Sequence, residues 1–131
     1  MNNIELTTRL KICHQLNALS DYCVKMSRDN ILSLLVEFND HHVVQRTFTE
    51  SSFWMASSLG IGELHSAISG NNQELIKSSL KSNLKVFSLH DDIKKLFHNP
   101  SQWEFAVSWY LEVYRYITID FDFNSKEIEA A

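Results

Sequence analysis

Apolar residues recur every three or four positions along most of the chain, which is the spacing of one face of an α-helix. The pattern predicts a first helix over about residues 4–26. It predicts a second helix, capped by Ser27 or Asp29, that ends near residue 41. The first third of the chain is therefore expected to form two consecutive helices.

Two short helices, 50–59 and 62–69, are predicted next, because a glycine follows each of them. A longer helix starts after Asn71 or Asn72, and its apolar row is Ile76, Leu80, Leu84 and Phe87. Three lysines line its opposite face: Lys77, Lys81 and Lys85. A last helix, rich in aromatic residues, is expected to begin at the capping box Ser101-Gln102-Trp103-Glu104.

Two segments depart from this helical spacing. Residues 42–49 are rich in β-branched side chains, and over 117–123 apolar and polar residues alternate, which is typical of a strand with one buried face. We expect these two segments to pair as a short two-stranded β element. Residues 124–131 are expected to form a short, frayed acidic tail to a domain that spans residues 1–123.

Composition supports a helical fold, because 131 residues contain only three glycines and one proline. Sheet proteins turn often and use these two residues to do so. The fold class predicted is therefore mainly α: a compact single-domain bundle of about six to seven helices, with the short β element. No run of apolar residues is long enough for a membrane span, and the first residues lack the pattern of a secretory signal.

The chain offers few recognisable sites for catalysis or metal binding. The three glycines cannot form a phosphate-binding loop, and the six histidines occur in no metal-binding spacing. The two cysteines, Cys13 and Cys23, are read as reduced thiols of a cytoplasmic protein. No cofactor, no metal and no enzymatic activity are therefore expected.

One short motif points to a different function. Arg9 and His14 are separated by four residues, a spacing that resembles the active-site motif of the helical HEPN ribonucleases. This resemblance implies a metal-independent ribonuclease, in which the arginine would stabilise the scissile phosphate and the histidine would transfer a proton. It is the first alternative hypothesis.

Acidic residues are concentrated in the middle of the chain. Residues 29–76 contain six acidic side chains and one basic side chain, Arg46, within a chain whose net charge is −4. Such a segment attracts basic proteins and repels nucleic acid. The predicted partner-binding residues combine these acids and neighbouring aromatics with a second acidic patch: Glu37, Asp40, Glu50, Phe53, Trp54, Glu63, Asp120 and Asp122.

These observations favour a small acidic protein-binding protein. The specific hypothesis is a bacterial immunity protein or antitoxin that occludes the active cleft of a basic toxin, the toxin being a nuclease. Its partner would be a protein, with no nucleic acid or membrane involved. This chain itself would act as a monomer. The second alternative is a secretion chaperone or regulatory adaptor that forms a homodimer through the aromatic last helix.

Overall fold

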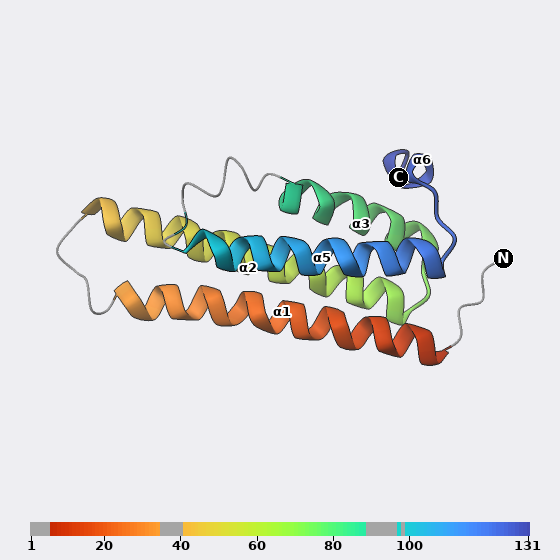
Figure 1. Cartoon of the computed structure of the whole chain (residues 1–131), viewed down its shortest axis with the longest axis horizontal. Helices are drawn as coiled ribbons and strands as arrows, with labels where there is room; N and C mark the ends of the chain where they lie inside the picture. Colours follow the sequence, from red (N-terminus) through yellow and green to blue (C-terminus); the bar gives the residue numbers. More distant parts are fainter. Residues whose placement is uncertain (1–5, 35–40, 89–96, 98) are drawn as a thin grey trace.

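The computed structural model describes residues 6–34, 41–88, 97 and 99–131 (Figure 1). Its helices are α1 (Leu6–Leu34), α2 (His41–Ser69), α3 (Gln73–Ser88), α5 (Pro100–Asp120) and α6 (Ser125–Glu129). The prediction of a mainly helical fold is confirmed. Within these ranges there are five helices and no strand, in place of six to seven helices and a β element.

The four long helices form a ring in which each one packs against two neighbours. α1 contacts α2, α2 contacts α3, α3 contacts α5, and α5 returns to contact α1 (Figure 1). This arrangement is that of an antiparallel four-helix bundle. None of the helices in the described ranges has the length and apolarity needed to cross a membrane.

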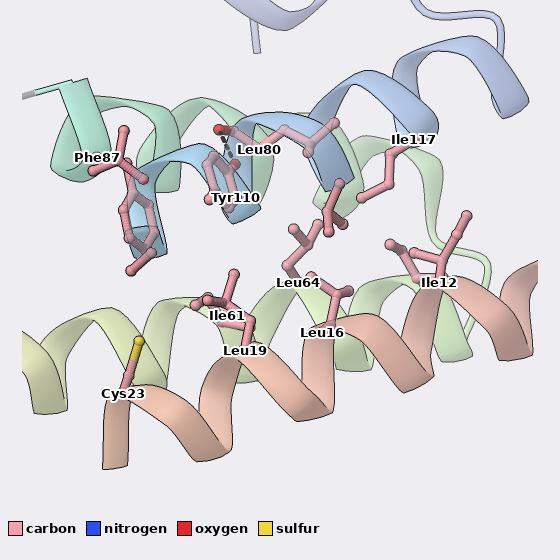
Figure 2. Packing of buried hydrophobic residues seen from close by; sticks show 14 of the residues in the cluster. Ile12, Leu16, Leu19, Cys23, Ile61, Leu64, Leu80, Phe87, Tyr110 and Ile117 are labelled. Atoms are coloured by element: carbon pink, nitrogen blue, oxygen red, sulfur yellow. Dashed lines mark hydrogen bonds between the residues drawn. The ribbon is translucent and has the colours of Figure 1, made fainter. Parts of the chain in front are cut away.

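Each long helix buries one row of side chains with alternating steps of three and four residues. On α1 this row is Ile12, Leu16, Leu19, Cys23 and Met26, and on α5 it is Trp103, Ala106, Tyr110, Val113 and Ile117. This spacing aligns packed helices nearly along one another. The rows meet inside the bundle, where the Tyr110 hydroxyl donates a hydrogen bond to the Leu80 carbonyl at 3.0 Å (Figure 2).

On α1, small polar side chains at intervals of seven residues lie against α2. Ser20 and Ser58 share a hydroxyl–hydroxyl hydrogen bond of 2.8 Å, and Ser27 and Ser51 share another of 2.8 Å. One interval earlier on α1, Cys13 Sγ lies 3.4 Å from Ser69 Oγ. We call these six residues the polar seam. Because they are small and bonded to one another, the two helices approach closely in a single antiparallel register.

Contacts with neighbouring helices explain why two predicted helix breaks are absent. Ser27 does not cap a new helix, because its buried hydroxyl bonds to the Ser51 carbonyl at 3.1 Å, and α1 continues to Leu34. α2 likewise continues through Gly60 and Gly62. At Gly60 the side chain of Asn83, from α3, lies against the helix and donates a 2.9 Å hydrogen bond to the Gly60 carbonyl.

The predicted pairing of 42–49 with 117–123 is wrong, because the first segment lies in α2 and most of the second lies in α5. The alternation that suggested a strand includes Ile117 and Phe121, which are one helical turn apart and both buried. α5 ends in a left-handed residue, Asp122, with φ 55°. The Phe123 amide then bonds back to the Thr118 carbonyl, which is a Schellman helix end.

The helix starts also differ in part from the prediction. Asn72 caps α3 as expected, because its side-chain oxygen accepts a 3.2 Å hydrogen bond from the Leu75 amide. The capping box at Ser101 is not the start of α5. Asn99 occupies the cap position and Pro100 begins the helix, while the Ser101 hydroxyl donates to the Asn99 side chain.

The prediction that residues 124–131 are frayed is wrong, because they include the short helix α6. Asn124 caps α6 by accepting a 2.9 Å hydrogen bond from the Glu127 amide, and Ile128 is buried. Lys81 of α3 donates to the Glu129 carbonyl at 2.7 Å. Lys77 lies 5.1 Å from the centre of the Phe123 ring. Two lysines of the predicted outer stripe therefore hold the C-terminal segment on α3.

Two glycines of α2 allow a matched stability experiment. Alanine in place of glycine in a helix normally stabilises it by about 0.5–1 kcal/mol. At Gly62 a new methyl group meets no atom within 4 Å, whereas at Gly60 it overlaps the Asn83 amide group. We expect Gly62→Ala to raise the free energy of unfolding and Gly60→Ala to lower it by about 1–3 kcal/mol in urea titrations. Equal effects at both positions would contradict the close packing of α2 on α3.

Buried hydroxyl and thiol groups predict a loss of stability in alkali. Burial raises the pKa of the Cys23 thiol from 9.0 to about 12, and burial also raises the pKa of Tyr110. The unfolded chain loses these protons first, so the free energy of unfolding should fall by about 1.4 kcal/mol per pH unit for each group, above pH ~9 for Cys23 and above pH ~10 for Tyr110. We expect Cys23→Ala to show a shallower fall in denaturant titrations over this range. An unchanged slope would show that the thiol is not buried.

Candidate functional site

The predicted acidic surface on the middle of the chain is only partly present. Glu37 and Asp40 lie outside the described residues. Glu50 is 2% exposed, next to Ser51 of the polar seam, and so offers almost no surface to a partner. Glu63 is exposed on α2. Of the two described acids of this segment that were predicted to bind a partner, Glu50 and Glu63, only Glu63 is accessible.

The two predicted aromatic anchors belong to the interior. Trp54 is 0% exposed, and its ring meets the rings of Tyr22 and Trp103 edge to face at 5.9 and 5.2 Å. Phe53 is half-buried against the core. Trp54 fills the space between α2 and α5, which are opposite members of the ring, so its role in this structure is to pack the core.

The second predicted patch, Asp120 and Asp122, is exposed at the end of α5. Asp122 forms the left-handed turn described above, whereas Asp120 lies on the last turn of the helix. Asp120 lines a surface hollow between α5 and α1. Asp120 is therefore a residue predicted from the sequence that lies in a concave part of the surface.

An aromatic patch that the sequence analysis did not single out lies on the same two helices. It consists of Tyr22 on α1 and Phe105 and Trp109 on α5. The Tyr22 and Phe105 rings meet at 5.3 Å, and those of Phe105 and Trp109 at 5.7 Å. Phe105 is nevertheless 54% exposed. Large exposed aromatic side chains held in place by one another are typical of protein interfaces.

Two hollows lie on the surface of α5, and α1, its neighbour in Figure 1, lines one of them. The first, about 290 Å³, is lined by Phe105, Ser108, Trp109 and Glu112. The second, about 250 Å³, is lined by Thr8, Lys11, Ile12, Gln15, Val113, Tyr116 and Asp120. Together with Tyr22, these residues define what we call the α1–α5 groove.

Hydrogen bonds fix several side chains of this groove. Trp109 Nε1 donates to Gln15 Oε1 at 3.2 Å, which ties the two helices together between the hollows. The Tyr116 hydroxyl donates to Glu112 Oε1 at 3.5 Å. The Arg115 guanidinium lies 5.9 Å from the centre of the Tyr116 ring. An exposed ring beside two carboxylates, Glu112 and Asp120, is a surface suited to a basic side chain.

The arginine and histidine of the ribonuclease-like motif do not form a common site. Arg9 Nη1 donates to the carbonyls of Ser69 and Ile68 at 3.0 and 3.5 Å, so it caps the end of α2. His14 is exposed and lies five residues further along α1, which turns it roughly 140° away around the helix. In the described part of the chain, no cluster of histidine, cysteine or carboxylate side chains suits a metal ion.

Comparison with protein-family models, with curated proteins and with solved structures gives no match to this chain. The groove is therefore interpreted from its own geometry.

The sequence does contain a signal for the groove. On α5 the positions 105, 109, 112, 116 and 119 follow one another at steps of four and three residues, in parallel with the buried row that starts at Trp103. A helix on the surface of a bundle needs only one such row. A second row of mostly apolar residues indicates a second contact face.

Proposed function

We propose that this chain is a small protein-binding protein that takes up a basic partner in the α1–α5 groove. The observation that supports this most strongly is the aromatic patch, because Phe105 and Trp109 line one hollow with the carboxylate of Glu112, and Asp120 lines the second hollow. Aromatic anchors supply most of the binding energy at protein interfaces, and surrounding carboxylates favour basic partners. The net charge of −4 acts in the same direction at longer range.

Within this class, we propose an inhibitor of the bacterial immunity or antitoxin type. Such a protein needs a preformed surface rather than a catalytic centre, and it acts by covering the active cleft of its partner. The groove is suited to this role because its aromatic side chains are held by one another and by the Gln15–Trp109 hydrogen bond. Side chains that are already ordered lose less conformational entropy on binding.

The partner can be identified by photo-crosslinking in a lysate of the native cell. Ser108 is exposed and lines the first hollow, so benzoylphenylalanine at this position should crosslink to the partner. Ser82 is exposed on α3, which does not adjoin the groove, and provides the matched control position. We expect a basic protein to crosslink at position 108 and not at position 82. An excess of this chain without benzoylphenylalanine should compete and abolish the crosslink.

Inhibition of that partner then tests the function and places the surface. The double variant Glu112→Lys with Asp120→Lys should raise the concentration needed to inhibit the partner at least tenfold, because it places positive charges opposite those of a basic partner. Glu63→Lys, on the exposed face of α2, should leave inhibition unchanged. If Glu63→Lys abolishes inhibition and the double variant does not, the groove is not the interface. If the partner stays fully active, the inhibitor proposal is wrong.

A further inference from the structure

The outer row of α5 has the pattern of one strand of a coiled coil. Its members are Phe105, Trp109, Glu112, Tyr116 and Ile119, at successive steps of four, three, four and three residues. Tyr116 is 49% exposed and Ile119 is 66% exposed. Residues at this spacing form a nearly straight line along a helix, which is the feature that a second helix recognises. The row is roughly 21 Å long at 1.5 Å per residue.

The adjacent face of α1 provides the other wall. Thr8, Lys11 and Gln15 line the second hollow, and Tyr22 packs on Phe105 at the opposite end of the row. Because α1 and α5 are antiparallel, this wall accompanies the outer row along most of its length (Figure 1). The surface is therefore a line of two hollows along α5, the second of which has α1 as its other wall, and this shape fits a rod-shaped segment.

The charge at the centre of the row distinguishes between possible occupants. Glu112 is exposed and has two apolar residues of the row on each side. A second copy of this chain that matched the whole row symmetrically, parallel or antiparallel, would place Glu112 against its own copy. Two like charges facing each other in an interface are unfavourable. A helix with lysine or arginine at that point would instead pair with the carboxylate.

We infer that the occupant of the α1–α5 groove is an amphipathic helix of the basic partner. This inference rests on the proposed function and adds the form of the contact. The helix presents two apolar residues, a central lysine or arginine, and two more apolar residues, at coiled-coil spacing. The basic side chain meets Glu112, and the apolar residues contact the aromatic patch at one end and Tyr116 with Ile119 at the other.

Two synthetic peptides test the form of the contact without the natural partner. Each is a helix of about 20 residues with leucine at the four outer contact positions. One has arginine at the central position and the other has glutamate. By fluorescence anisotropy of labelled peptide, we expect the arginine peptide to bind the full chain at least tenfold more tightly than the glutamate peptide. Glu112→Arg should reverse this preference.

The charge reversal also separates this inference from its premise. If neither peptide binds, or both bind equally well in the wild type and in Glu112→Arg, the helical contact is wrong. The proposed function would still stand if Ser108 crosslinks to a basic partner that the chain inhibits. If no such partner is crosslinked, the proposed function fails, whatever the peptides do.

Self-association provides a second measurement that does not need a peptide. Glu112→Leu completes the apolar row, so in sedimentation velocity we expect this variant to dimerise at high micromolar concentration while the wild type remains a monomer. Asp21→Leu, at an acidic position on α1 that is also exposed and lies outside the row, is the matched control and should remain monomeric. Two results would overturn the inference. In the first, the wild type forms a dimer that Trp109→Ala abolishes, so that a second copy of the chain is the occupant. In the second, Glu112→Leu remains a monomer.

Discussion

The close antiparallel packing of α1 on α2 is the constraint on which the rest of the bundle depends. Two pairs of serines in their polar seam, Ser20 with Ser58 and Ser27 with Ser51, lie seven residues apart on each helix and so occupy equivalent positions. A shift of one helix along the other would leave buried hydroxyl groups without partners, and such groups are costly. The seam therefore sets the register in which the buried rows of the two helices face α3 and α5.

This register decides what surface remains for binding. α5 completes the ring by packing one row into the core and by resting its side on α1, where Trp109 bonds to Gln15. Its outer row, with Phe105 and Tyr116, is left at the surface, bounded by α1. The groove is thus a product of the bundle itself rather than of a loop, and its walls are regular helices. This favours a preformed binding surface.

The sequence predicted the helical class and the inward face of α3, because burial of apolar side chains at helical spacing determines both. It did not predict the length of α2, since Gly60 normally ends helices but here admits the Asn83 side chain from a distant helix. Ile117 and Phe121 were assigned to a strand because steps of two and of four residues coincide over a short segment. The α1–α5 groove was missed in the sequence for a related reason. Local reasoning treated Trp54 as an anchor, whereas whether an aromatic residue is buried or exposed depends on which helices become neighbours.

If the α1–α5 groove is the binding surface, the environment of Trp109 changes when the partner binds, and the three tryptophans allow this to be measured directly. In the protein labelled with fluorotryptophan, fluorine NMR with a soluble paramagnetic probe reports the exposure of each ring. Trp54 and Trp103 are fully buried, and Trp109 is partly exposed. We predict that the probe broadens only the Trp109 signal, and that saturation with the crosslinked partner shifts this signal and protects it. A Trp109 signal that remains unshifted and equally accessible to the probe in the complex would show that the α1–α5 groove does not bind the partner.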